Sequence, residues 1–101
     1  MKRSLAITDE KITDQIHHLR GKKVMFDFDL AGLYGVDMRQ LKRQVRRNLD
    51  RFPADFMFEL TAKEFKNLRC QIGTSSWGGT RYAPMAFTEQ GVAMLSSVLN
   101  S

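Results

Sequence analysis

The clearest pattern of apolar and polar positions along the chain begins at Asp27. Over residues 27–34 apolar side chains recur at helix-compatible spacing, and Asp27 stands where a carboxylate can cap a helix. Gly35 follows, and glycine readily adopts the left-handed conformation with which helices often end. Asp37 can cap a second helix, and Gln40 completes the polar pair of a capping box. The pattern therefore predicts two short helices joined by a tight turn.

The second helix is expected to extend from Met38 to Leu49, with an apolar stripe along one side. At about 100° per residue, the stripe and the polar positions separate cleanly. The stripe consists of Met38, Leu41, Val45 and Leu49. The opposite side carries Arg39, Gln40, Arg43 and Arg47, flanked by Lys42 and Arg46 on one edge and Gln44 on the other. A solvated face is the ordinary explanation of such charges, but the acidic partners typical of one are nearly absent here.

The two helices have the spacing of a DNA-binding helix-turn-helix. Small Ala31 lies four residues before Gly35, where the helices approach most closely, and Leu41 lies six residues after it, where the second helix returns to the core. Gln44 departs from the pattern, because an apolar residue is expected there. The alternative is a glycine-turned helical hairpin in a structural bundle.

Arginine can pair with guanine through two hydrogen bonds and glutamine with adenine, while flanking cations bind phosphates. We therefore expect this basic helix to lie in a major groove. The predicted DNA-contacting residues are Arg39, Gln40, Lys42, Arg43, Gln44, Arg46, Arg47, Arg51 and Arg81.

The segments before this helix pair are an arm and a hairpin. Residues 1–14 are polar with scattered aliphatic side chains and are interpreted as an N-terminal arm. Residues 15–26 contain two short runs with apolar residues around a Gly21–Lys22 turn, which predicts a β-hairpin.

The segment after the pair predicts a strand and a helix. Phe56, Phe58 and Leu60 alternate with Met57 and Glu59, as in a strand with one buried face. A capping box then opens a helix that continues to about residue 72. Its capping residues are Thr61 and Glu64, and its inner face carries Phe65, Leu68 and Ile72.

The remainder contains a loop, a short strand and a last helix. Residues 73–80 are rich in Gly and Ser, so Trp77 and Arg81 either touch nucleic acid from a wing-like loop or belong to a connection that packs Trp77 on the body. Residues 82–87 predict an edge strand, because Pro84 cannot donate to a ladder. Thr88 can cap the last helix, whose apolar side carries Val92, Met94, Leu95, Val98 and Leu99.

Together these elements predict an α+β fold: a small domain with a helix-turn-helix-like pair, a β-hairpin plus short strands, and two further helices. The chain has 101 residues, enough for one domain at residues 15–101, and its formal net charge of +5 favours polyanionic partners. The last helix reaches the chain end without a stop signal, which indicates a longer natural protein. No apolar run approaches the length of a membrane span.

The residues that could support catalysis or metal binding have simpler explanations. His17 and His18 are adjacent, so in a strand their side chains point to opposite faces. Asp27 and Asp29 fall in the first helical turn, where the helix dipole stabilises acids. Cys70 is the single cysteine and has no histidine nearby in sequence, so no disulfide or nucleophile is indicated. We expect no enzymatic activity, no cofactor and no metal.

Three segments of the sequence also resemble a known family. They are GKKVMFDFDLAGLYGV at residues 21–36, RRNLDRFPADFMFELT at 46–61 and RYAPMAFTEQGVAMLSSVLNS at 81–101. They resemble the KilA-N-related N-terminal domain of phage antirepressor-type proteins, the open-reading-frame-six N-terminal family, over about residues 15–101. The resemblance implies a DNA-binding module of phages, prophages or large DNA viruses, placed before a separate effector domain that this chain does not contain. It implicates the LAGLYGV turn and the helix after it, but does not itself assign base contacts to individual arginines.

The main hypothesis is thus a double-stranded DNA-binding domain of a phage or prophage antirepressor-like or transcription-regulating protein. It would act in the cytoplasm of a bacterial host and bind as a homodimer, because one helix reads few base pairs. The alternative is a protein-interaction or oligomerisation module with only non-specific affinity for nucleic acid, in which the last helix binds a partner. RNA is less favoured, because the aromatic residues stand mostly at core positions.

Overall fold

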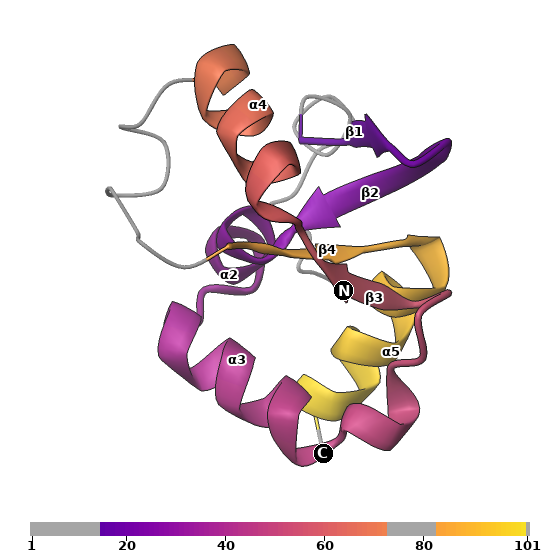
Figure 1. Cartoon of the computed structure of the whole chain (residues 1–101). Coiled ribbons are helices and arrows are strands. Elements are labelled where there is room, and N and C mark those ends of the chain that lie inside the picture. Colours follow the sequence, from indigo (N-terminus) through magenta and orange to yellow (C-terminus); the bar gives the residue numbers. More distant parts are fainter. Residues whose placement is uncertain (1–14, 73–82, 101) are drawn as a thin grey trace.

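The computed structural model describes residues 15–72 and 83–100 (Figure 1). The elements in chain order are β1 (His17–Leu19), β2 (Lys22–Phe26), α2 (Asp27–Tyr34), α3 (Met38–Arg47), the 3-10 turn η1 (Leu49–Arg51), β3 (Met57–Glu59), α4 (Ala62–Ile72), β4 (Met85–Phe87) and α5 (Glu89–Leu99). This order of helices and strands confirms the predicted α+β class. The predicted N-terminal arm at residues 1–14 lies outside the described residues.

The predicted hairpin is present, with its turn one residue earlier than expected. Strands β1 and β2 pair antiparallel, and the Leu19–Lys22 pair closes a two-residue turn at Arg20 and Gly21. Both turn residues have positive φ, 55° and 73°, as the tight turn that suits the twist of two strands requires. Glycine adopts this conformation readily, whereas Arg20 does so against its ordinary preference.

The strands form one antiparallel sheet in the order β1-β2-β4-β3, so the strand nearest the C-terminus lies in the interior of the sheet. The prediction that this segment is an edge strand is therefore wrong. Pro84 comes just before β4, so its missing N–H removes no bond from the ladder. Its carbonyl still accepts a hydrogen bond from the backbone N–H of Leu60, at 3.2 Å.

Helices cover both faces of this sheet. Figure 1 shows α4 on one side and α3 and α5 on the other. In β3, Met57 is buried on the side of α3 and α5, while the partly buried Phe58 packs against the cluster beneath α4. The prediction of a strand with one buried face, with Met57 outside it, is wrong, because both faces of the sheet are packed.

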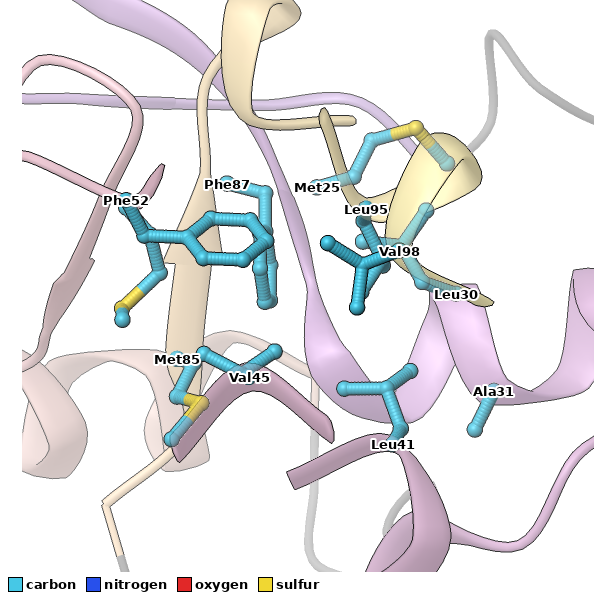
Figure 2. Packing of buried hydrophobic residues seen from close by; sticks show 11 residues of the cluster. Met25, Leu30, Ala31, Leu41, Val45, Phe52, Met85, Phe87, Leu95 and Val98 are labelled. Atoms are coloured by element: carbon cyan, nitrogen blue, oxygen red, sulfur yellow. The ribbon is translucent and has the colours of Figure 1, made fainter. Parts of the chain in front are cut away.

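The larger apolar cluster lies between the sheet and the helices α2, α3 and α5 (Figure 2). Phe87 of β4 is fully buried there, and its ring meets that of Phe52 edge to face, with centroids 5.9 Å apart. Leu41 and Val45 of α3 are also fully buried in it. The whole cluster consists of Met25, Leu30, Ala31, Leu41, Val45, Phe52, Met57, Met85, Phe87, Leu95 and Val98. This packing holds α3 against the sheet by one side only.

Candidate nucleic-acid interface

The turn between α2 and α3 has the predicted geometry. Gly35 ends α2 in the left-handed region, with φ 67° and ψ 34°. The backbone N–H of Val36 donates to the carbonyl of Ala31 at 3.0 Å, so carbonyls at the end of α2 are satisfied within the turn. Ala31 is buried where the two helices meet. A tight glycine turn therefore joins the two helices, as the spacing around Gly35 predicts.

Helix α3 begins as predicted but ends two residues early. The Asp37 carboxylate accepts a hydrogen bond from the backbone N–H of Arg39 at 2.8 Å, which confirms the cap. At the other end, the side chain of Asn48 donates to the carbonyl of Gln44 at 2.8 Å and the helix stops at Arg47. Leu49 falls in η1 and is 54% exposed, so the prediction that it continues the apolar stripe is wrong.

The outer side of α3 is a basic, solvent-exposed surface, hereafter the arginine face. Its exposed residues are Arg39, Gln40, Arg43, Arg46 and Arg47. Arg51 of η1 is exposed just beyond the end of the helix. Within the described residues, none of the five arginines forms an ion pair with a carboxylate. Gln44 is half-buried beside this face and bonds Asn48 through its carbonyl.

Lys42 is placed differently from the other predicted contacts. Its side chain is 13% exposed, and its Nζ lies 3.6 Å from Oδ2 of Asp27 at the start of α2. No spacing rule predicts this pair, because the two residues lie fifteen positions apart in different helices. The structure thus brings Lys42 to the inner flank of α3 and leaves the arginines outside.

Asp27 is buried and does not occupy the predicted cap position. Phe26 is the N-cap of α2 and Asp27 is the first helical residue. The carboxylate accepts hydrogen bonds from the backbone N–H of Phe28 at 2.7 Å and of Met85 at 3.0 Å. Burial raises the pKa of Asp27, while these bonds and the nearby Lys42 ammonium oppose the rise. Asp27 therefore joins α2, β4 and α3 at one point inside the domain.

A second carboxylate lies close by, facing the hairpin. Asp29 Oδ2 is 3.7 Å from Nε2 of His17. Burial, together with the Asp27 carboxylate, raises the pKa of Asp29 to about 6. Burial and the neighbouring His18 lower the pKa of His17. Since the His17 imidazole is therefore mostly neutral at pH 7, the contact with Asp29 is a weak one.

Arg20 at the hairpin tip fastens the hairpin to α4 on the far side of the sheet. Its guanidinium donates two hydrogen bonds to the Glu64 carboxylate, both at 2.9 Å, and lies 4.0 Å from the centre of the Phe58 ring. Glu64 and Thr61 also form the predicted capping box of α4, through bonds of 2.8 and 3.2 Å. The hydrogen bond to Arg20 is the main cause that lowers the pKa of Glu64 to about 2.

Several features bear on the other candidate chemistries. Arg81 and the loop around Trp77, the predicted wing, lie outside the described residues. In the parts of the chain that are described, no three His, Cys, Asp or Glu side chains gather as a metal site would need. Cys70 is exposed on α4. None of the described helices is long and apolar enough to cross a membrane.

The chain is thus a small α+β domain. Helices cover both faces of its antiparallel sheet, and one of these helices is basic and is held by a glycine turn. The family model described as "ORF6N domain" matches residues 14–98. The chain therefore belongs to the ORF6N domain family, which confirms the family predicted from its sequence motifs. No curated protein and no solved structure matches the chain.

Proposed function

We propose that this domain binds double-stranded DNA by placing the arginine face of α3 in the major groove. The observation that carries the proposal is that four arginines of a ten-residue helix are exposed on the side opposite two fully buried apolar residues. The major groove is wide enough to admit an α-helix such as α3, and arginine recognises guanine through two hydrogen bonds.

The positions around the helix suggest separate roles. Arg39, Arg43 and Arg47 lie along the middle of the arginine face, so they are placed to reach base edges together with Gln40. The remaining exposed arginines, Arg46 and Arg51, are placed to meet phosphates at its margin. Base contacts specify sequence, whereas phosphate contacts supply affinity that depends on salt.

The biological setting that we propose follows from the family and from this surface. The domain acts without catalysis, cofactor or metal, in the cytoplasm of a bacterial host. It serves a phage or prophage protein that regulates transcription or antagonises a repressor, as the proposed relation to KilA-N domains suggests. It binds as a homodimer, because one short helix contacts only a few base pairs.

A second candidate function, binding to another protein, is favoured by one observation. Tyr34, at the end of α2 beside the turn, is 37% exposed, and Leu49, just beyond the end of α3, is 54% exposed. Such residues can anchor a protein partner or a second copy of the domain. In that case the arginine face would supply only non-specific attraction to nucleic acid.

Selection of random-sequence duplex DNA by the purified domain, at two salt concentrations, tests the proposal. We expect enrichment of a palindromic motif, with half-site spacing that reports the geometry of the dimer. Weak binding that is lost at moderate salt and enriches no motif would contradict base reading and favour the second candidate.

Single variants assign the contacts. Arg43→Ala and Arg47→Ala are expected to relax base preference and to cost about 1–3 kcal/mol of binding free energy each. Lys66→Ala is the matched control, because it removes the same charge from an exposed site on α4, across the sheet from α3. Equal losses on every DNA sequence would make Arg43 and Arg47 phosphate contacts.

A further inference from the structure

The buried carboxylate of Asp27 connects three elements that meet behind the arginine face. Asp27 is fully buried, with 0% of its surface exposed. Its Oδ1 accepts from the backbone N–H of Phe28 in α2, and its Oδ2 accepts from that of Met85 in β4. The same Oδ2 lies 3.6 Å from Nζ of Lys42 in α3. One side chain thus links the helix before the turn, the helix after it and an interior strand of the sheet.

The burial of the Asp27 carboxylate costs folding free energy unless its hydrogen-bond donors and Lys42 stay beside it. A buried carboxylate loses its hydration, and only hydrogen bonds and an opposite charge offset that loss. Lys42 supplies the charge with a side chain that is itself 13% exposed. A lysine committed to an internal carboxylate is poorly placed to contact a phosphate outside.

Apart from the turn at Gly35, the rest of the attachment of α3 is apolar and carries little directional information. The fully buried side chains of this helix are Leu41 and Val45. Apolar contacts are non-directional, so they hold the helix against the sheet without strictly fixing its rotation about its own axis. Neighbouring residues are separated by about 100°, so even a partial rotation changes which arginines point outward.

We propose that Asp27 and Lys42 are positioning residues, whose pair fixes the rotation of α3 and so decides which side chains the helix presents to DNA. Lys42 then contributes to binding through Asp27 and not through a phosphate. The proposal rests on the DNA-binding function proposed above and assigns to it two residues that do not touch the nucleic acid.

Two substitutions that add the same charge test this idea with opposite expected signs. Asp27→Asn and Asp37→Asn each remove one negative charge near α3, which by electrostatics alone strengthens DNA binding in both cases. Asn caps a helix about as well as Asp, so Asp37→Asn keeps the helix start. We expect Asp27→Asn to weaken binding about tenfold in spite of its added positive charge, as mutations along a coupling network can. Asp37→Asn should bind as well as the wild type or better. Stronger binding by both variants would overturn the proposal.

A second pair of variants tests whether Lys42 acts through Asp27 or through a phosphate, without changing Asp27. Lys42→Met is expected to lower affinity while the slope of log affinity against log salt stays at the wild-type value. Arg46→Ala, on the exposed side of the same helix, should reduce that slope by about 0.9, as the loss of one phosphate contact does. A similar reduction for Lys42→Met would make Lys42 a phosphate contact and overturn the proposal.

The orientation of α3 can also be measured in the free protein. Residual dipolar couplings of backbone amides vary periodically along a helix, and the phase of this variation reports the rotation of α3 about its own axis relative to the sheet. We expect a changed orientation in Lys42→Met and the wild-type orientation in Arg46→Ala. An unchanged orientation in Lys42→Met would refute the positioning role. If the wild type bound no DNA, the proposed function would fail while this measurement still decided the role of the pair.

Discussion

Gly91 of α5 lies directly against the backbone carbonyl of Phe56. A Cβ atom at Gly91 would overlap the Phe56 oxygen and lie 2.7 Å from its carbonyl carbon. The same oxygen accepts a hydrogen bond from the backbone N–H of Thr88 at 2.9 Å. The Thr88 hydroxyl donates to the carbonyl of Asp55 at 2.6 Å and accepts from the N–H of Gly91 at 3.3 Å. The cap of α5 is therefore fixed to the chain segment that enters β3.

Gly91→Ala should consequently destabilise the domain, by about 2–4 kcal/mol in the free energy of unfolding. The obstacle is backbone, which cannot move aside as a flexible side chain can. Urea denaturation measures the change. Gly32→Ala is the matched control, because Gly32 lies in α2 with no atom within 4 Å of an added Cβ. Alanine there should stabilise the helix by about 0.5–1 kcal/mol. Equal effects of the two variants would show that α5 does not pack this closely.

Gly35→Ala should destabilise the turn between α2 and α3 for a different reason. Nothing lies within 4 Å of a Cβ at Gly35, so the cost comes from its φ of 67° alone. We expect a loss of about 1–2 kcal/mol, typical of an L-residue in the left-handed region. Gly35→Asn should lose less, because asparagine tolerates this conformation better. Equal melting temperatures for Gly35→Ala and the wild type would contradict the left-handed conformation at Gly35.

The link between Arg20 and Glu64 should make the domain sensitive to strong acid. The pKa of Glu64 is lowered to about 2 in the folded protein, below its ordinary value of 4.5. The stability it contributes is therefore present above pH 4.5 and is lost as the pH falls through 2. Glu64→Gln should flatten the dependence of melting temperature on pH over this window.

The partner substitution checks the origin of that effect. Because the guanidinium of Arg20 is the main cause of the lowered pKa, Arg20→Gln should flatten the same window. Combining the two substitutions should then produce little further change, as expected of residues that act through one interaction. Additive effects would mean that Glu64 owes its low pKa to another group.

Asp29 should act on stability in the opposite direction. Its pKa is raised from 3.8 to about 6, so its favourable contribution is fully present below pH 3.8 and is lost as the pH rises through 6. Between pH 5 and 7.5 the wild type should lose about 1 kcal/mol that Asp29→Asn does not lose, after allowance for solvent screening. Because His17 lies 3.7 Å from Asp29, the comparison is repeated with His17→Gln in both proteins, which separates the contribution of Asp29 from that of His17. Parallel stability curves for the two proteins would contradict the raised pKa.

Local signals in the sequence were sufficient for most of the elements. The Thr61 and Glu64 capping box, the Thr88 cap and the glycine turn at Gly35 each depend on residues within four positions of one another. These hydrogen bonds join residues that are close in sequence, which explains why the local pattern predicts α2, α4 and α5 closely. The exposed arginine side of α3 follows equally from helical periodicity.

The features that the sequence did not reveal depend on distant contacts. The place of β4 inside the sheet is set by pairing with β2 and β3, whereas Pro84 carries only a local signal against strand structure. Asp27 accepts from Met85, 58 positions away, and no spacing rule indicates that contact. A helical wheel predicts the angle of Lys42 beside the arginines but not the buried carboxylate that lies 3.6 Å from its ammonium group.

The position of β4 also determines how late in synthesis on the ribosome the sheet can form. Strands β2 and β3 do not pair with each other and are joined only through β4, which is synthesised after both. Leu41 and Val45 share their cluster with Phe87, so α3 also lacks part of its support until that residue emerges. A nascent chain that ends before residue 85 would carry every arginine of α3 without the sheet that holds the helix. We therefore expect the nascent chain to gain DNA affinity late in translation, with the emergence of β4 and α5.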